Sequence, residues 1–274
     1  SSAAKMMNSG PQNGTCVMAS SVRRGRISPM SQRFACDRED DRRTGLAAAM
    51  AAIRRGALVV FPTDSSYAVA CDAFRPAATS ALRAAKGRSP DAPLPVLIGA
   101  PGTADGIVRD LSGAARDLMA AFWPGPLTLI ARAQPSLMWE VDFSGTLGVR
   151  MPLHPVALEL LRQSGPLAAT GANYVGFGVP TTCDDAQAQL GDTVAVYLDA
   201  GELHGGAGSA VVEVSTEPPR LLRAGGVAIT DLVSVCPELA GLPELAELPA
   251  AALPTVTPDE PQSPVAGRPD PEDL

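Results

Sequence analysis

Apolar residues recur at helical and at strand spacings along the middle of the chain, and the two spacings alternate. Spacings of three and four residues predict helices, whereas short apolar runs that stop at Gly or Pro predict strands. The predicted helices cover residues 44–55, 76–85, 113–122, 155–163, 183–190 and 229–233. The predicted strands cover residues 57–61, 95–98, 127–132, 146–150, 167–170, 194–198, 209–214 and 220–223. This alternation predicts one α/β domain over residues 45–235.

The two ends of the chain lack these spacings. Residues 1–29 are small, polar and rich in turn-forming types, so we assign residues 1–44 to a mostly disordered N-terminal extension. Residues 236–274 carry a proline every few positions among Ala, Glu and Leu. Proline at that density prevents a continuous helix, and the segment is predicted to be an acidic, Pro-rich disordered tail.

Charge and composition narrow the class of function. The formal net charge of the chain is -7, and residues 236–274 alone hold eight acidic residues and one arginine. An acidic balance argues against a broad basic face and therefore against direct RNA binding.

No run of about eighteen apolar residues is present, so no membrane span is expected. The five cysteines form no C-x-x-C pair, which predicts free thiols in a reducing, cytoplasmic setting. The chain has only two histidines, which disfavours a histidine-based catalytic triad or metal site. No metal ligand is assigned.

Lys86 is one of only two lysines in a chain that otherwise uses arginine for positive charge. It stands with Gly87 and Arg88 just after a predicted helix. An ammonium and a guanidinium separated by a glycine suit phosphate oxygens, because the backbone can come close to the ligand. The alternative is a solvated helix C-terminus, where cations complement the helix dipole and glycine caps the helix.

Hydroxyl, amide and cationic side chains also follow the ends of several predicted strands. The motifs are Pro62-Thr63-Asp64-Ser65-Ser66-Tyr67, Phe122-Trp123-Pro124-Gly125-Pro126-Leu127-Thr128, Val149-Arg150-Met151-Pro152, Thr170-Gly171-Ala172-Asn173, and Gly208-Ser209 with Leu222-Arg223. Such groups at the ends of strands in an α/β sheet predict a phosphate-bearing ligand. The chain has no G-x-x-x-x-G-K-[ST] loop and no strand-linked G-x-G-x-x-G, which disfavours a P-loop kinase or a nucleotide dehydrogenase.

These motifs, in this order, resemble those of the YrdC-like L-threonylcarbamoyladenylate synthases, from about residue 56 to residue 233. The resemblance implies an open, twisted, mixed α/β sheet whose concave face holds a basic cavity. It also implies a nucleotidyltransferase that joins L-threonine, bicarbonate and ATP into threonylcarbamoyl-AMP and pyrophosphate, with Mg²⁺ accompanying ATP. Partner proteins would then move the threonylcarbamoyl group to adenosine in tRNA.

The resemblance also implies roles for individual residues. Lys86 and Arg88 would be catalytic through the ATP phosphates, and four further residues would bind ATP: Thr128, Asn173, Thr181 (or Thr182 in its place) and Arg223. The expected threonine contacts are Ser65, Arg132, Gly171 and Ser209, and the expected pocket wall is Thr63, Tyr67 and Arg150. Arg150 could instead be a buried ion-pair partner. Trp123 is expected to pack in the core.

Four positions depart from the family pattern. The family usually has Thr, Gly, Ser and Thr where this chain has Ser65, Ala68, Gly171 and Ala210. These changes leave the identity of the acid open. The alternatives are a carbamoyl-adenylate-forming enzyme with a different acyl substrate and a non-catalytic, RNA-binding YrdC-like protein.

Overall fold

The fold is built on one mixed sheet, seen in a computed structural model that describes residues 31–137 and 145–241. The strands are β1 (Gln32–Ala35), β2 (Leu58–Pro62), β3 (Tyr67–Asp72), β4 (Val96–Leu97), β5 (Val108–Arg109), β6 (Leu127–Ala133), β7 (Thr146–Arg150), β8 (Leu167–Gly171), β9 (Val194–Asp199), β10 (Ala210–Glu213) and β11 (Arg220–Arg223). Their order across the sheet is β1-β9-β2-β3-β8-β4-β7-β6-β10-β11, with β5 paired to β6. Parallel and antiparallel pairs alternate irregularly, so neither a hairpin meander nor a pure βαβ sheet describes the topology.

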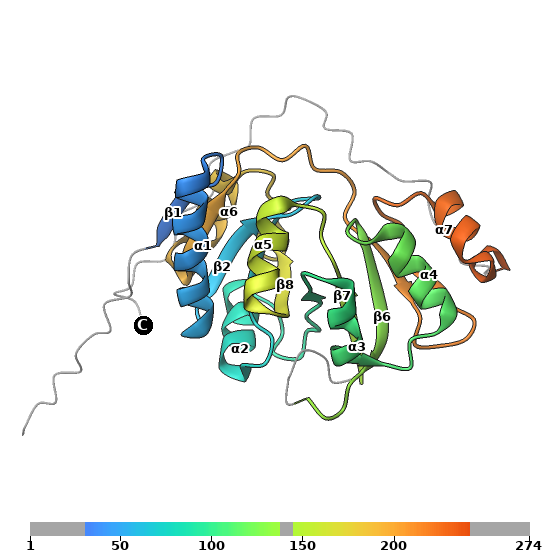
Figure 1. Ribbon diagram of the computed structural model, residues 1–274. Helices are drawn as coiled ribbons and strands as arrows, with labels where there is room; N and C mark the ends of the chain where they lie inside the picture. Colours follow the sequence, from blue (N-terminus) through green and yellow to red (C-terminus); the bar gives the residue numbers. More distant parts are fainter. Residues whose placement is uncertain (1–30, 138–144, 242–274) are drawn as a thin grey trace, which may run out of the picture.

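Seven α-helices and three 3₁₀ turns accompany the sheet in the described ranges (Figure 1). The helices are α1 (Glu39–Arg54), α2 (Pro76–Ala85), α3 (Ala104–Ile107), α4 (Gly113–Phe122), α5 (Pro155–Ser164), α6 (Cys183–Leu190) and α7 (Ile229–Val235). The 3₁₀ turns are η1 (Pro101–Thr103), η2 (Gly191–Thr193) and η3 (Pro237–Gly241). Local sequence explains several helix ends: α2 and α5 begin with proline, and the Ser112 side chain accepts a hydrogen bond from the Ala115 N–H at the start of α4.

Alternation along the strands divides the core between the two faces of the sheet. On one face, α1 and α5 pack side by side over β2, β3, β8 and β9 (Figure 1). On the other face, a larger cluster includes α2, α4, α6 and α7. In β6 and β7, Leu127, Leu129 and Val149 belong to the second cluster. Because neighbouring residues of a strand point to opposite faces, Thr128 and Arg150 point to the face that carries α1 and α5.

The predicted elements in the interior of the domain are present in the structure, whereas β3, α3 and β5 were not predicted and the N-terminal boundary differs. The mixed α/β class and the helices over residues 76–85, 113–122 and 183–190 are confirmed. The assignment of residues up to 44 to a disordered extension is wrong from Gln32 onward, because β1 pairs in parallel with β9 and α1 begins at Glu39. At the other end, Cys236 and Leu239 are buried, so the domain continues through η3. The predictions for residues 1–29 and 242–274 lie outside the described residues.

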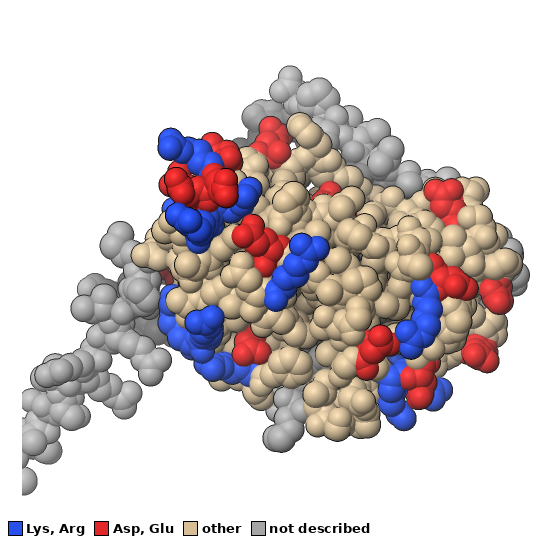
Figure 2. Space-filling view, in the orientation of Figure 1, with Lys and Arg blue, Asp and Glu red and all other residues tan. Residues whose placement is uncertain are grey.

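Figure 2 shows one face of the molecule, on which charges of both signs are interspersed. Over the start of α1, Arg38 pairs with Asp41 and Arg43 pairs with Asp40, both in exposed positions. Exposed pairs of this kind contribute little to stability. Within the described ranges, no helix has both the length and the apolar character needed to cross a membrane.

Candidate active site

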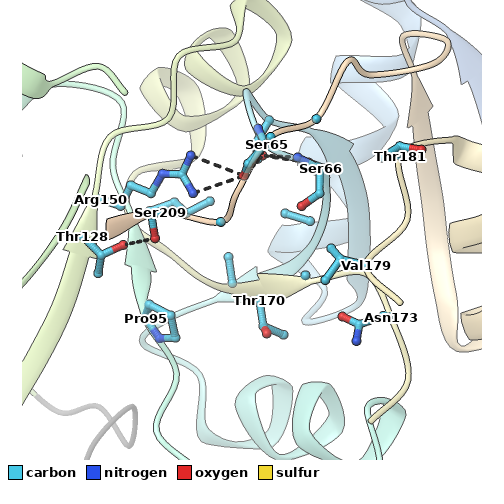
Figure 3. Close-up of a pocket in the computed structure, with 18 of the residues that line it drawn as sticks. Ser65, Ser66, Pro95, Thr128, Arg150, Thr170, Asn173, Val179, Thr181 and Ser209 are labelled. Carbon is cyan, nitrogen blue, oxygen red and sulfur yellow. Dashed lines mark hydrogen bonds between the residues drawn. The ribbon is translucent and has the colours of Figure 1, made fainter. Parts of the chain in front are cut away.

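A cavity of about 460 Å³ opens on the sheet where the predicted motifs converge (Figure 3). Its walls come from the turn before β3, the ends of β6, β7 and β8, and the loops before α6 and β10. Arg88, Arg150 and Arg223 all line it, and no carboxylate is among the lining residues. A cavity of this size suits a small molecule, and its charge suits an anion.

One side of the cavity is built around Arg150. Its Nε donates to the Gly125 carbonyl at 3.1 Å, and its Nη2 donates to Asp64 Oδ1 at 2.6 Å. Nη1 and Nη2 also lie 3.4 and 3.5 Å from Ser65 Oγ, toward which the guanidinium points in Figure 3. The side chains of Arg150 and Asp64 are only 10% and 13% exposed. Hydrogen bonds to Gly125 and Asp64 therefore hold the guanidinium through Nε and Nη2. Its outer edge, formed by Nη1 and Nη2, faces the cavity beside Ser65.

A tight turn explains how Gly125 reaches Arg150. Trp123 is buried, and its indole Nε1 donates to the Leu127 carbonyl at 2.8 Å, which fixes the chain just before Thr128. The Gly125 N–H donates to the Met151 carbonyl at 2.8 Å. A Cβ on Gly125 would lie 2.5 Å from the Phe122 carbonyl oxygen, so the turn needs glycine. The expected packing role of Trp123 is confirmed.

Thr128, Ser209 and Arg223 form a second group, brought together by neighbouring strands. β10 runs parallel to β6, and Thr128 Oγ1 lies 2.8 Å from Ser209 Oγ (Figure 3). Arg223, on β11, donates through Nη2 to the Ser209 carbonyl at 2.8 Å and to its hydroxyl at 3.2 Å. Burial, and then the nearby Arg150, lower the pKa of Arg223 below its ordinary value. Arginine side chains are always charged in proteins near neutral pH, so Arg223 contributes a positive charge to the cavity.

Lys86 lies beneath the opposite side of the cavity rather than on its surface. The residue is 2% exposed, and its ammonium donates to the Gly171 carbonyl and to Asn173 Oδ1, the latter at 2.8 Å. Burial, and then repulsion from Arg88, lower the pKa of Lys86 to about 8. Lys86 is the C-cap of α2, and Gly87 beside it has a φ of 66°, so the helix-end alternative describes the backbone correctly. The side chain, however, is directed to Gly171 and Asn173, which line the cavity.

The sequence profile of the Sua5, YciO and YrdC proteins, described as "Telomere recombination", matches residues 51–225, more than half of the chain. The chain belongs to this family. A Mycobacterium tuberculosis relative, whose name assigns it provisionally as a threonylcarbamoyl-AMP synthase, is 45% identical over 207 residues, which are 75% of this chain and 95% of the relative. The threonylcarbamoyl-AMP synthase of Bacillus subtilis is 35% identical over 193 residues, which are 69% of this chain and 56% of that protein.

Solved structures of the Sua5/YciO/YrdC family share the fold. The structure of Pyrococcus abyssi Sua5 complexed with L-threonine is 31% identical with a TM-score of 0.69, covering 77% of this chain and 62% of that chain. This chain thus spans less than two thirds of the length of the archaeal protein. Escherichia coli YciO, at 21% identity and a TM-score of 0.65, shows the likeness of the fold alone.

Two residues that the family resemblance brought to the site lie outside the cavity. Arg132 is not among its lining residues; its side chain is 53% exposed, and its Nε donates to the Ser215 carbonyl at 3.3 Å. It follows Thr128 by four positions on β6, so it lies about 13 Å further along the strand. Tyr67 is buried away from the cavity, and its hydroxyl donates to the Gly201 carbonyl at 2.7 Å. The structure therefore does not bring Arg132 or Tyr67 to the surface of the cavity, where the family resemblance had placed them.

The other predicted residues are gathered as expected. Besides Lys86 beneath the surface, the cavity is lined by Thr63, Ser65, Arg88, Thr128, Arg150, Gly171, Asn173, Thr181, Ser209 and Arg223. Thr63 Oγ1 donates to the Ser66 carbonyl at 2.7 Å and thus closes the turn before β3. Of the two alternatives Thr181 and Thr182, only Thr181 lines the cavity. The Thr182 hydroxyl instead accepts a hydrogen bond from the Asp185 N–H as the N-cap of α6.

Sequence reasoning missed part of the lining. Ser66, Pro95 and Val179 line the cavity, as do the backbone-rich positions Gly205 and Gly206. The run Gly205-Gly206-Ala207-Gly208 was a usable signal, since glycines allow close approach of a ligand to the backbone. A Cβ on Gly205 would lie 2.4 Å from the Ser65 carbonyl oxygen, so this loop packs directly on the turn before β3.

Proposed function

We propose that this chain is a threonylcarbamoyl-AMP synthase, which joins L-threonine, bicarbonate and ATP into threonylcarbamoyl-AMP and pyrophosphate. The observation that carries the proposal is one cavity, in a member of the family, with Lys86 and Asn173 on one side and Arg150 and Ser65 on the other. In this proposal the product passes to partner proteins that modify adenosine in tRNA, in the cytoplasm.

The nucleotide is assigned to the side with Arg88, Asn173 and Thr181. Arg88 lines the cavity and offers a planar fork to phosphate oxygens. The Lys86 ammonium has three N–H donors, of which two are used by Gly171 and Asn173, so the third is left for a phosphate. Lys86 also fixes the Asn173 amide, whose Nδ2 donates to the Phe177 carbonyl at 2.8 Å.

The amino acid is assigned to the side with Arg150, Ser65 and Ser209. The outer edge of the Arg150 guanidinium matches the two oxygens of a carboxylate. The hydroxyl of Ser65 lies against that edge, where it can meet a polar group of the acid. In this proposal Arg150 takes the role that the family resemblance implied for Arg132. The L-threonine named in the Pyrococcus abyssi complex supports threonine as the acid.

The chemistry needs alignment and charge stabilisation more than a base. The neutral amine of threonine and bicarbonate form a carbamate: the N–C bond forms, and one proton of the amine leaves with the bicarbonate hydroxyl as water. A carbamate oxygen is an anionic nucleophile. This oxygen forms a bond to the α-phosphorus of ATP, while the bond from that phosphorus to the bridging oxygen breaks and its electron pair leaves with pyrophosphate. Lys86, Arg88 and Arg223 stabilise the charge that develops on the phosphates.

Magnesium enters this proposal as part of the substrate, MgATP. No carboxylate lines the cavity, and the described residues contain no group of three or more His, Cys, Asp or Glu side chains placed to hold a metal. Mg²⁺ in proteins is usually bound by one or two carboxylates together with phosphates. The residues present therefore do not form a resident metal site, and the phosphates would carry the ion.

The proposed function is tested by pyrophosphate release from ATP and bicarbonate, with and without L-threonine. We expect threonine to stimulate release, and serine to do so more weakly because it lacks one methyl group. Stimulation by carbamoyl phosphate in place of threonine would support the carbamoyl-adenylate alternative. No release with any of these acids would support the non-catalytic alternative.

A further inference from the structure

Asp64 lies behind the cavity wall and touches the cavity only through Arg150. Its Oδ1 accepts from Arg150 Nη2 at 2.6 Å and from the Leu153 N–H at 3.1 Å. Its Oδ2 is buried and has no hydrogen-bond partner in the structure. Asp64 is not a lining residue, so a ligand in the cavity would not contact it directly.

The hydrogen bonds of Arg150 divide into two short ones and two long ones. The bonds to Asp64 and to the Gly125 carbonyl are 2.6 and 3.1 Å, whereas both approaches to Ser65 Oγ are 3.4 Å or more. Distances near 3.5 Å mark weak hydrogen bonds. The guanidinium is thus anchored by Asp64 and Gly125, and its Nη1–Nη2 edge is left weakly bonded toward the cavity.

Stability alone is a poor reason for such a pair. Removing two charges from water costs free energy that their attraction often fails to recover, and here one carboxylate oxygen also stays unpaired. A carboxylate at this place does two other things. It fixes the direction of the fork, and it leaves the Arg150 charge only partly compensated on the side that faces the cavity.

We propose that Asp64 is a positioning residue: it holds the Arg150 guanidinium so that the Nη1–Nη2 edge faces the carboxylate of the bound amino acid beside Ser65. The inference rests on the proposed function for the identity of that acid. It makes Asp64 part of amino-acid binding although Asp64 contacts no substrate.

Asp64→Asn removes only the negative charge of this side chain, because an amide oxygen can still accept hydrogen bonds at the Oδ1 position. We expect KM for threonine to rise about tenfold, as follows from weakening a hydrogen bond to a charged group, with KM for ATP changed less than twofold. Arg150→Lys keeps the charge but removes the fork, and it should raise KM for threonine as well. Asp105→Asn is the matched control: it removes a carboxylate from the exposed Arg116–Asp105 pair, and both KM values should stay unchanged.

A double-mutant cycle shows whether Asp64 acts through Arg150. If it does, Asp64→Asn should change kcat/KM for threonine less than twofold once Arg150 is Met, since the group it positions is gone. An equal loss in both backgrounds would overturn the proposal. So would an Asp64→Asn protein with a lower melting temperature and an unchanged KM for threonine.

A third measurement separates this proposal from the proposed function. In ¹⁵N-labelled protein, the Nη groups of Arg150, assigned with Arg150→Lys, should rotate slowly in the wild type and faster in Asp64→Asn. This readout needs no turnover, so it decides the positioning role even if threonine does not stimulate pyrophosphate release. Identical Arg150 signals in the two proteins would overturn the proposal.

Discussion

At the scale of single residues, Lys86 is a buried cation whose ammonium donates to two neutral oxygens, the Gly171 carbonyl and Asn173 Oδ1. The alternative of a solvated helix end does not describe its side chain, because Lys86 is 2% exposed and bonded to Gly171 and Asn173. A truncation to alanine would therefore leave a cavity as well as remove a charge. Met is the better replacement, because it keeps most of the volume.

Lys86→Met should reduce pyrophosphate release at least 100-fold, on the order of 2.7 kcal/mol of transition-state stabilisation. The melting temperature at pH 7 should change little. The folded-state pKa of about 8 lies below the ordinary value of 10.5, so at pH 7 folding must bury a charge that the unfolded chain keeps in water. Removing that cost offsets the two lost hydrogen bonds. Full activity in Lys86→Met would contradict the phosphate assignment.

The same pKa predicts how ATP binding depends on pH. Because the pKa of Lys86 is lowered to about 8, the ammonium is lost as pH rises through that value. ATP affinity, measured by calorimetry from pH 6.5 to 9.5, should fall across this range in the wild type. Lys86→Met should bind ATP weakly with little change over the same pH values. The wild-type protein should also gain stability as pH rises from about 8 toward 10.5, since the cost of burying the charge disappears.

Gly171 is a second residue at which the surrounding atoms decide the effect of a substitution. A serine at this position matches the family pattern and would restore a hydroxyl, but its Cβ would lie 3.0 Å from Asn173 Oδ1 and 3.1 Å from Val179 Cγ1. Asn173 Oδ1 is the acceptor for Lys86. We therefore expect Gly171→Ser to raise KM for ATP several-fold, about 1 kcal/mol, by displacing this acceptor. Gly171→Ala brings the same Cβ without the hydroxyl, so any advantage of Ser over Ala in KM for threonine measures the hydroxyl alone.

At the scale of elements, Tyr67 ties the start of β3 to the end of β9. Its hydroxyl donates to the Gly201 carbonyl at 2.7 Å and accepts from the Ala200 N–H at 3.0 Å. Burial, and then the proximity of Asp199, raise the pKa of this hydroxyl, despite the opposing hydrogen bond from Ala200, so it stays neutral. It is a structural group rather than a wall of the cavity.

Tyr67→Phe should therefore lower the free energy of unfolding by about 1–3 kcal/mol, because buried polar groups lose their partner. The urea midpoint should fall without a change in m-value. Both KM values should remain within twofold of the wild type. A rise in KM for threonine with unchanged stability would return Tyr67 to the binding site.

Many elements with strong local signals were predicted, although the buried apolar strand β3 was missed, and β1, which depends on a distant partner, was missed as well. The helices α2, α4 and α6 were predicted to the residue from apolar spacing with proline, glycine and hydroxyl ends. β1 was missed because Gln32-Arg33-Phe34-Ala35 has no apolar alternation and is a strand only through its pairing with β9. The early start of α1 did have a signal, since Glu39, Asp40 and Asp41 occupy its first turn.

The candidate site was predictable where a motif is local. Lys86 and Arg88, or Thr63 and Ser65, share one turn, so their spacing in sequence is their spacing in space. Arg132 was misplaced because a match in sequence does not show how far an extended strand carries a side chain from the cavity. The role of Asp64 depends on a contact with Arg150, 86 positions away, which no local pattern contains.

At the scale of the whole molecule, the folded domain begins at β1, several residues before the first residue at which the hydrophobic pattern predicted it. Removing residues 1–38 deletes β1 and exposes the edge of β9, whereas removing residues 1–30 leaves β1 in place. We expect the longer deletion to melt several degrees lower than the shorter one, because a few kcal/mol of pairing and packing is lost. Equal melting temperatures for the two deletions would show that β1 contributes nothing to stability.

Because β10 pairs with β6, the cavity contains residues from distant parts of the sequence, from Thr63 near the start of the domain to Arg223 near its end. Ser209 bonds Thr128 across 81 positions, and Arg223 follows 14 positions later. A polypeptide that ends before Ser209 can still contain Lys86, Arg88 and Asn173, but it lacks Arg223, one of the four cations at the site, and one wall of the cavity. We therefore expect a chain that ends before Ser209 to show no ATP-dependent pyrophosphate release, because the cavity is complete only once β11 is present.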